Sequence, residues 1–276
     1  MTPGSRTPGE LARRYGPYAL VAGASEGIGE AFARALASEG IHLVLVARRA
    51  GPLQALAGEL RDARGIDVRA IPCDLADPDS VRALLAATAD CEIGLLVYNA
   101  ASSSVGPFLD TPVASHMAMI DVNVRAPVLL AHDLAVSMAR RKRGGIILMS
   151  SLTAFQGTPL VATYGATKAF NLVLAEALWS EWSDHGIDVL SCCAGATATP
   201  GYDRVTPSQA AARFGPRPQA PGDVAREALA ALGRRPVVIT GRGNRLASFV
   251  LRRVLSRKRA VLLMTGAMKA RYDPRT

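Results

Sequence analysis

The sequence predicts a single α/β domain in which a doubly wound parallel sheet of about seven strands carries helices on both faces. Apolar runs of strand length, rich in Val, Ile and Leu, recur along the chain without polar alternation, as in strands that are buried on both faces. Segments with a helical spacing of apolar residues separate these runs. About seven such strand–helix units use most of the 276 residues, so one large domain accounts for the chain.

The predicted elements follow one another in alternating order. The strands are Tyr18 to Ala22, Ile41 to Ala47, Ile66 to Pro72, Ile93 to Asn99, Gly145 to Ser150, Ile187 to Ala194 and Pro236 to Thr240. The helices are Gly27 to Glu39, Pro52 to Ala63, Pro78 to Ala89, Ser115 to Arg140, Tyr164 to Asp184 and Gly222 to Leu232. Strands that alternate with helices pack as one parallel sheet. We therefore expect a main domain at residues 17–243, with an N-terminal arm at 1–16 and a basic helical extension at 244–276.

Composition excludes several classes of protein. Hydrophobic residues make up 49% and charged residues 20% of the chain, which is typical of a globular protein and not of a disordered one. The four cysteines have no C-x-x-C spacing and are too few for a disulfide scaffold, so we expect a cytoplasmic protein without a metal site. The N-terminal residues lack the apolar core of a secretory signal, and the longest uncharged stretch, 144–167, contains too many polar residues to span a membrane.

The positive charge lies at the C-terminal end. Twelve Lys or Arg residues and one acid lie between Arg234 and Thr276, so this segment carries +11 and the first 233 residues carry −2. The body of the protein is therefore not expected to bind nucleic acid. The extension either covers the substrate pocket or a subunit interface, or makes weak peripheral contact with an anionic membrane. Because Arg253 and Arg257 interrupt its apolar face, we favour the covering role.

A glycine-rich turn follows the first strand and precedes the first helix. It has the sequence Gly23-Ala24-Ser25-Glu26-Gly27-Ile28-Gly29. Glycines at these positions permit a tight turn and let backbone amides at the helix start approach a pyrophosphate. The turn therefore indicates a dinucleotide site. The same residues also fit the G-x-S-x-G nucleophile elbow of an α/β-hydrolase with Ser25 as nucleophile, but no histidine near the C-terminus would complete its triad.

Two arginines at the end of the second strand indicate which dinucleotide binds. A site for an unmodified ribose places an acid roughly 20 residues after the glycine turn, whereas an arginine there accommodates a 2′-phosphate. No Asp or Glu lies between Glu39 and Glu59, and the strand ends in Arg48 and Arg49. This pattern favours NADP, with Ser25 adding a hydroxyl to the same phosphate.

A tyrosine and a lysine one helical turn apart supply candidate chemistry. Tyr164 and Lys168 share one face of a helix, and Ser150 and Ser151 end the preceding strand. An ammonium about 4 Å from a phenol, at an effective dielectric near 20, supplies about 4 kcal/mol, enough to lower a phenol pKa by about 3 units. We therefore expect Lys168 to make Tyr164 usable as an acid or base near neutral pH.

Together these residues resemble the short-chain dehydrogenase/reductase family of single-domain Rossmann folds. The matching segments are Gly23 to Gly29, Asn99-Ala100-Ala101, Ser151 and Tyr164-Gly165-Ala166-Thr167-Lys168. The resemblance implies four catalytic residues, Ser151, Tyr164, Lys168 and Asn123. It also implies cofactor contacts from Asp74, Leu75, Asn99, Ala100 and Thr199, and from Tyr164 and Lys168. Ala22, Ala101 and Ala194 depart from the family pattern.

The resemblance implies an NADP-dependent oxidoreductase that transfers a hydride between nicotinamide and a carbonyl or alcohol. Tyr164 would act as the proton donor with Ser151, and Lys168 would also hold the nicotinamide ribose. The segment from Pro200 to Pro221 corresponds to the family's variable substrate loop, and its apolar Tyr202 and Phe214 suggest a lipophilic ketone or secondary alcohol. A homodimer or homotetramer is expected. The alternative class is a non-catalytic NADP-binding regulator, which would have no need of the complete catalytic set.

Overall fold

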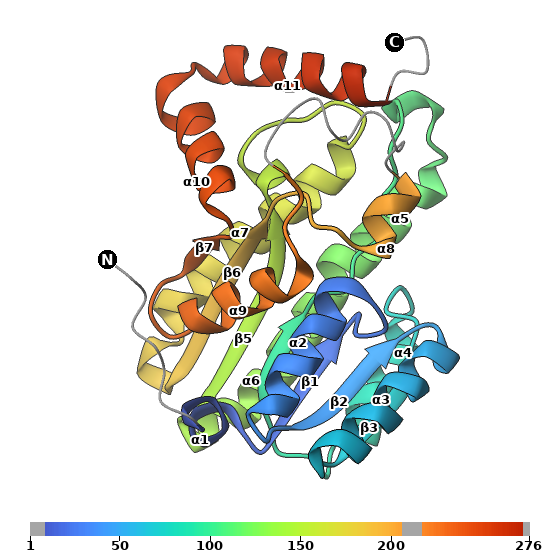
Figure 1. Ribbon diagram of the computed structural model, residues 1–276, viewed down its shortest axis with the longest axis vertical. Coiled ribbons are helices and arrows are strands. Elements are labelled where there is room, and N and C mark those ends of the chain that lie inside the picture. The colour runs from blue at the N-terminus through green and yellow to red at the C-terminus, as the bar shows by residue number, and fades with distance from the viewer. Residues whose placement is uncertain (1–8, 206–216, 273–276) are drawn as a thin grey trace.

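A seven-stranded parallel sheet forms the centre of the molecule. The computed structural model describes residues 9–205 and 217–272. The strand order is β3-β2-β1-β4-β5-β6-β7, and every pair of neighbours is parallel. The strands are β1 Tyr18–Ala22, β2 His42–Ala47, β3 Val68–Pro72, β4 Ile93–Tyr98, β5 Gly144–Ser151, β6 Ile187–Ala194 and β7 Val237–Ile239. The predicted doubly wound parallel sheet is confirmed (Figure 1).

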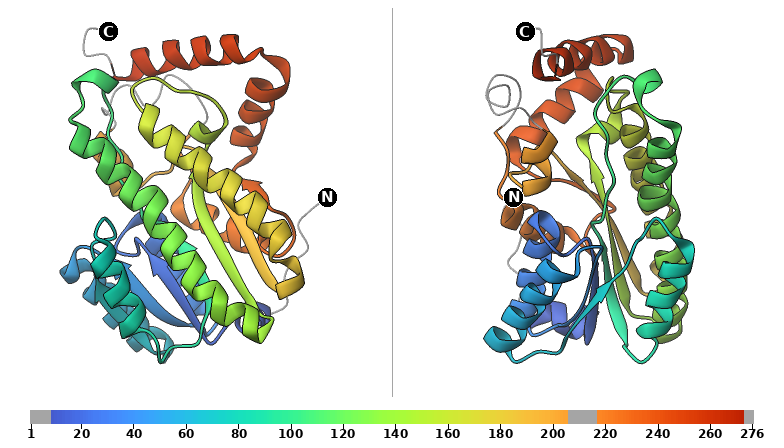
Figure 2. Two further views of the ribbon diagram at one scale, coloured as in Figure 1. Left: turned by 180° about the vertical axis from the view of Figure 1, so that it is seen from behind. Right: turned by 90° about the vertical axis from the view of Figure 1, so that its right-hand side faces the viewer.

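Helices cover both faces of the sheet (Figure 2). They are α1 Glu10–Tyr15, α2 Gly27–Ser38, α3 Ala50–Arg64, α4 Pro78–Ala87, α5 Val113–Ile120, α6 Ala126–Arg141, α7 Ala162–Glu181, α8 Pro200–Val205, α9 Pro221–Ala231, α10 Arg242–Phe249 and α11 Arg257–Tyr272. Apolar side chains of α1, α2, α3 and α9 pack in one core cluster, and those of α4, α6 and α7 pack in the other. The buried strands separate two apolar layers, which explains their uninterrupted Val, Ile and Leu runs.

The strand order reverses between β1 and β4. From β1 the chain runs outward through β2 to β3 and then returns to β4 on the other side of β1. In open α/β sheets, ligands bind outside the carboxyl ends of the strands at such a switch point. Figure 1 shows α10 and α11 beyond this same end of the sheet.

Within residues 9–205 and 217–272, no helix combines the length and the apolar character that crossing a membrane requires. In the same residues, no three or more His, Cys, Asp and Glu side chains are grouped so that they would hold a metal ion. All four cysteines are buried and free.

Helix α1 packs into the core although its residues were assigned to an N-terminal arm. Tyr15 is fully buried, and its hydroxyl donates to the carboxylate of Asp188 at 2.7 Å. The aromatic ring lies against Gly145 of β5, where an added Cβ would come within 2.9 Å of it. Arg14 pairs with the same Asp188 at 2.6 Å. These contacts join α1 to β5 and β6, and they could not be predicted from the local sequence pattern.

The burial of Tyr15 predicts a large effect on stability. Tyr15→Ala should lower the free energy of unfolding by roughly 3–5 kcal/mol, because it leaves a cavity against the sheet. Tyr15→Phe, which keeps the ring and removes the hydrogen bond, should cost about 1 kcal/mol. Urea unfolding followed by circular dichroism measures both. A Tyr15→Ala variant as stable as the wild type would show that α1 does not pack into the core.

Candidate active site

The functional side chains predicted from the sequence gather at the carboxyl ends of adjacent strands. The glycine turn follows β1, Asn99 follows β4 and Ser151 ends β5. In the register of the sheet, Ala22 pairs with Tyr98 and Ser151 pairs with Ala194. Because the strands are parallel neighbours, the groups that follow them share one edge of the sheet.

The glycine turn has the backbone geometry of a phosphate cradle. Gly23 and Gly27 have φ values of 79° and 62°, the left-handed region that favours glycine. A Cβ on Gly29 would lie 2.0 Å from the carbonyl oxygen of Gly23, so a side chain there would prevent the turn from closing. The turn leads directly into α2, whose first amide groups lack intrahelical partners. Residues and backbone therefore fit a dinucleotide pyrophosphate at this point.

The segment after β4 supports the glycine turn. The side-chain amide of Asn99 donates to the carbonyl oxygen of Gly23 at 3.0 Å. A Cβ on Gly23 would lie 2.7 Å from the backbone of Ala100, so the two segments touch. Asp74 is exposed at the end of β3 and accepts from the amide of Ala76, and Leu75 beside it is buried. These residues lie along the edge where the adenosine half of a dinucleotide would be placed.

The two arginines after β2 differ in their surroundings. Both Arg48 and Arg49 are exposed. The guanidinium of Arg49 pairs with the carboxylate of Glu26 at 2.5 Å, and Arg204 of α8 pairs with the same carboxylate. The hydrogen bond with Arg204, followed by that with Arg49, lowers the pKa of Glu26, so this carboxyl is ionised at neutral pH. An anion binding to Arg49 would therefore meet a negative charge in the same turn.

Ser151, Tyr164 and Lys168 lie together. The Ser151 hydroxyl lies near enough to the Tyr164 phenol to lower its pKa. The ammonium of Lys168 lies 5.6 Å from the centre of the Tyr164 ring. Lys168 is buried and donates from Nζ to the carbonyl oxygen of Met149 at 3.0 Å. The amide of Thr153 donates to Oγ of Ser151 at 3.2 Å, which leaves the Ser151 hydroxyl proton free to point toward a second acceptor.

The pKa of Tyr164 is raised overall, not lowered as the sequence led us to expect. Burial raises it above its usual value, and the nearby Ser151 hydroxyl acts in the opposite direction. Burial also lowers the pKa of Lys168 to about 8. The expectation from helical spacing left out desolvation, which is the largest influence on both groups. As a result Tyr164 is protonated at neutral pH, the form that can donate a proton.

Asn123 lies on a π-helical turn inside the predicted long helix. The sequence predicted one helix over Ser115 to Arg140, whereas the structure has α5, a π-helical turn at Asp121–Arg125, and α6. Such turns recur at functional sites. The Asn123 side chain is fully buried, accepts from the amide of Ser102 and donates to the carbonyl oxygen of Ser102, both at 2.8 Å. It thereby ties the π-helical turn to the loop after β4.

Two further residues of α7 hold the π-helical turn in place. The hydroxyl oxygen of Thr167 accepts from the side-chain amide of Asn123 at 3.0 Å. The side-chain amide of Asn171 donates to the backbone carbonyl of Asn123 at 3.0 Å. Our sequence analysis missed both, although their one-turn spacing on the helix that carries Lys168 places them on one face.

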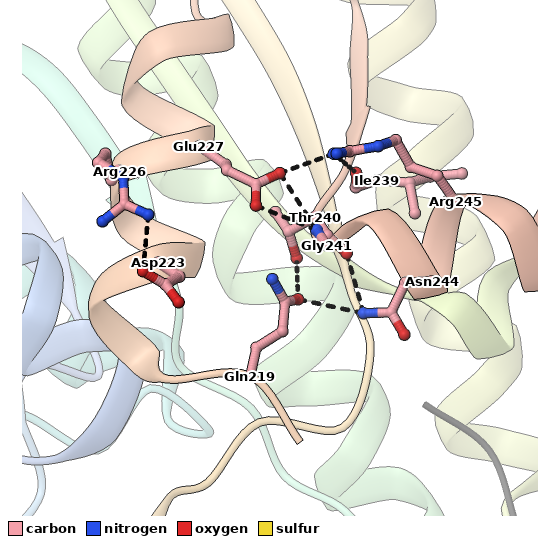
Figure 3. A network of polar contacts seen from close by, with 9 residues as sticks. All are labelled: Gln219, Asp223, Arg226, Glu227, Ile239, Thr240, Gly241, Asn244 and Arg245. Atoms are coloured by element: carbon pink, nitrogen blue, oxygen red, sulfur yellow. Dashed lines mark hydrogen bonds and ion pairs between the residues drawn. The ribbon is translucent and has the colours of Figure 1, made fainter. Parts of the chain in front are cut away.

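A polar network holds the segment that carries Thr199 (Figure 3). The side chain of Gln219 lies 2.8 Å from the Thr240 hydroxyl and 3.1 Å from the side-chain nitrogen of Asn244. Backbone hydrogen bonds join Gln219 to residues 196 and 198, just before Thr199. The side chain of Asn244 also packs closely against Gly195, because a Cβ on Gly195 would lie 2.5 Å from the side-chain nitrogen of Asn244. Thr199 in turn contacts the glycine turn, since a Cβ on Gly27 would lie 2.9 Å from its methyl group.

The C-terminal extension reaches the segment that follows Ser151. The carboxylate of Glu227 accepts from Gly241 and Arg245, which fixes the start of α10 (Figure 3). The guanidinium of Arg252 lies over the ring of Phe155 at 4.2 Å. Phe155 ends the 3-10 helix that begins one residue after Ser151. The extension therefore packs beside the segment that follows β5. Phe214, expected in the substrate loop, lies outside the described residues.

Comparison with known proteins identifies the family to which this fold belongs. Residues 17–210 match the family model described as short chain dehydrogenase. The chain therefore belongs to the short-chain dehydrogenase family, whose members are oxidoreductases that use a nicotinamide cofactor. This membership overturns the hydrolase alternative for the G-x-S-x-G sequence around Ser25.

Among its relatives is a 7beta-hydroxysteroid dehydrogenase of Collinsella aerofaciens, which is 34% identical over 242 residues, 85% of this chain and 90% of the relative. A solved 7beta-hydroxysteroid dehydrogenase structure superposes with a TM-score of 0.85 at 31% identity, covering 92% of this chain and 98% of the other. A short-chain dehydrogenase from Sphingobium yanoikuyae, solved in complex with NADPH, superposes with a TM-score of 0.72 at 32% identity and covers 81% and 87% of the two chains.

The buried ammonium of Lys168 predicts an unusual pH dependence of stability. Its pKa falls from 10.5 to about 8 on folding, so between these values the unfolded chain binds more protons, and stability from this group rises with pH. Below about pH 8 the ammonium is charged in the folded chain, so the full free-energy cost of burying it is present. Lys168→Met should therefore raise the free energy of unfolding at pH 7 by about 2 kcal/mol, roughly 3 from the lost desolvation cost less about 1 for the lost hydrogen bond.

The gain from Lys168→Met should shrink as the pH rises and vanish by about pH 10. Urea unfolding at several pH values measures it. The exposed Lys258, substituted in the same way, is the matched control and should show no such gain. A Lys168→Met variant that is less stable than the wild type at pH 7 would contradict the direction of the pKa shift.

Proposed function

We propose that this chain is an NADP-dependent reductase of a bulky, lipophilic ketone and, in the reverse direction, a dehydrogenase of the corresponding secondary alcohol. The observation that carries the proposal is that Tyr164 lies near Ser151, with the buried ammonium of Lys168 5.6 Å from the centre of the Tyr164 ring. This pair shares one edge of the sheet with the glycine turn. Arg48 and Arg49 supply positive charge for a 2′-phosphate, and a relative of known structure holds NADPH.

The residues of the chain perform the proton chemistry. A bound NADPH supplies the hydride that reaches the carbonyl carbon of the substrate. The hydroxyl groups of Ser151 and Tyr164 donate hydrogen bonds to the carbonyl oxygen, on which negative charge develops. Tyr164 then passes its phenolic proton to this oxygen, so the ketone gains one hydride and one proton. The pKa of Tyr164 is raised, so the protonated phenol that carbonyl reduction uses is the form present at neutral pH, whereas alcohol oxidation uses the phenolate.

In this proposal Lys168 has two roles. Its ammonium lies beneath the Tyr164 ring and stabilises the phenolate that remains after proton transfer, and it holds the nicotinamide ribose. Asn123 connects the site to solvent, so that Tyr164 can be protonated again. Asp74, Leu75, Asn99, Ala100 and Thr199 contact the cofactor along the edge of the sheet, as do Gly23, Ser25, Gly27, Ile28 and Gly29. Each of these roles is an assignment that binding and turnover measurements test.

The chief support for a lipophilic substrate comes from relatives of the chain. The hollow beside Tyr164 has a mixed lining, with apolar side chains at Phe108, Met119, Leu160 and Val161 and polar ones at Ser104, Thr111, His116 and Thr163. Related proteins are named 7beta-hydroxysteroid dehydrogenases, and a steroid alcohol is a lipophilic compound. The C-terminal extension, with Arg252 over Phe155, would cover this side of the site. We assign it that role in preference to weak contact with a membrane.

We further propose a cytoplasmic homodimer or homotetramer with no nucleic-acid partner. The outward faces of α6 and α7 carry exposed apolar side chains at Val136, Val173 and Trp179, which suits association of helices between subunits. The first 233 residues carry no net positive charge that would favour nucleic acid.

Removal of the phenolic hydroxyl tests the catalytic assignment. Tyr164→Phe should lower kcat for carbonyl reduction by about 10³-fold, because the proton donor is lost. NADPH binding, followed by fluorescence titration, should be unchanged. Tyr18→Phe, which removes a hydroxyl from a half-buried tyrosine bonded to Asp67, is the matched control and should keep full activity. Retention of turnover by Tyr164→Phe would overturn the assignment.

A substrate screen tests the proposed cofactor and substrate class together. Steroid, long-chain acyl and sugar ketones are offered with NADPH and NADH in parallel. We expect kcat/KM for the steroid or acyl ketones to exceed that for sugar ketones by at least about tenfold, and NADPH to be the better cofactor. Equal or greater turnover of sugar ketones would refute the lipophilic substrate, and a preference for NADH would refute the cofactor.

A further inference from the structure

Glu26 occupies an unexpected place for an acid, because it lies in the glycine turn beside the arginines expected to bind phosphate. Its carboxylate is shared by two guanidinium groups from distant parts of the chain. Oε2 of Glu26 lies 2.5 Å from Nη2 of Arg49 and 3.4 Å from Nη1 of Arg204. Oε1 of Glu26 accepts a hydrogen bond from Nη2 of Arg204. Neither Glu26 nor Arg204 was predicted to have a role from the sequence.

The pairing brings helix α8 onto the glycine turn. Arg204 belongs to α8, which begins the segment assigned to substrate binding. A Cβ on Gly201 would lie 3.9 Å from Oε1 of Glu26, so the first turn of α8 also rests beside this carboxylate. Thr199, directly before α8, contacts Gly27 through its methyl group. The substrate side of the site and the glycine turn are thus joined by one ion pair and one apolar contact.

This arrangement affects the charge that a 2′-phosphate would meet. A phosphate near Arg49 would lie close to the ionised Glu26, and a phosphate of charge about −2 and a carboxylate repel each other. Arg204 neutralises Glu26 from the opposite side. Arg48, Arg49, Arg204 and Glu26 together carry a net charge of +2, and without Arg204 this falls to +1.

We propose that Arg204, acting through Glu26, sets the affinity of the chain for the 2′-phosphate of the dinucleotide. Cofactor choice then depends on a residue of α8 as well as on the arginines after β2. The inference rests on the NADP-dependent function proposed above. The coupling also acts in the reverse direction. A bound phosphate that pairs with Arg49 separates Arg49 from Glu26, and Glu26 then pairs with Arg204 alone. Dinucleotide binding therefore strengthens the ion pair between the glycine turn and α8.

The test compares two nucleotides that differ in one group. Calorimetric titration of the full chain with 2′,5′-ADP and with 5′-AMP isolates the contribution of the 2′-phosphate without any turnover. Arg204→Met should weaken 2′,5′-ADP binding by about tenfold more than it weakens 5′-AMP binding. Both nucleotides carry the 5′-phosphate at the glycine turn, so the difference between them reports the 2′-phosphate beside Arg49 and Glu26. Glu26→Gln should strengthen 2′,5′-ADP binding by a similar factor.

The double variant Glu26→Gln/Arg204→Met distinguishes action through Glu26 from direct contact. With the carboxylate gone, Arg204 has no charge to neutralise, so the Met substitution should have little further effect in the Glu26→Gln background. Arg204→Lys, which keeps the charge, should bind like the wild type. Arg226→Met removes an exposed arginine of α9 that pairs with Asp223 and serves as the control.

Three results would overturn the inference: no binding of 2′,5′-ADP, no change in Arg204→Met, or the same loss from Arg204→Met whether or not Glu26 is present. Circular dichroism of each variant checks that it is folded. These binding results can be told apart from the outcome for the proposed function. If the chain reduces ketones with NADPH but the variants do not show the expected binding changes, the reductase function stands and the role of Arg204 is wrong. If the variants show the binding changes but the chain reduces no ketone, the role of Arg204 stands and the reductase function is wrong.

Discussion

The buried ammonium of Lys168 is the constraint on which the geometry of the site depends. Burying a cation is costly unless it is hydrogen-bonded, and here the carbonyl oxygen of Met149 accepts from it at 3.0 Å. The hydroxyl of Ser150 donates to the backbone carbonyl of Lys168 at 2.7 Å. Strand β5 and helix α7 are thus joined by two hydrogen bonds through one residue. These two hydrogen bonds also place Tyr164, which lies one helical turn before Lys168, near Ser151 at the end of β5.

Parallel strands then bring the remaining groups to this point. The glycine turn lies after β1 and its supporting Asn99 after β4, and β5 is the next strand in the sheet. The π-helical turn that carries Asn123 faces the loop after β4 and is held by α7. Polar groups that must be satisfied when buried are therefore paired across elements, so the fold and the site depend on the same hydrogen bonds.

The spacing of apolar residues and the turn residues between them were sufficient to predict the sheet and most helices. Strands β1 and β6 have the predicted bounds, because each is an uninterrupted apolar run whose ends are clear in the sequence. The features that sequence could not supply depend on contacts between distant residues. Tyr15 is buried against β5 by tertiary packing, and the pairing of Glu26 with Arg204 spans 178 positions. The wrong sign for the pKa of Tyr164 has the same origin, since desolvation is a property of the folded environment and not of residue spacing.

The proposed chemistry depends most on Tyr164 being a protonated donor beside Ser151. Its phenol can be followed by nuclear magnetic resonance of protein labelled with ¹³C at the tyrosine Cζ, with the spectrum of Tyr164→Phe used for assignment. We expect Tyr164 to titrate above the usual tyrosine pKa, and higher still in Ser151→Ala, because the Ser151 hydroxyl, which opposes the effect of burial, is removed. A titration midpoint below the usual tyrosine value, or one that is unchanged in Ser151→Ala, would contradict this chemistry.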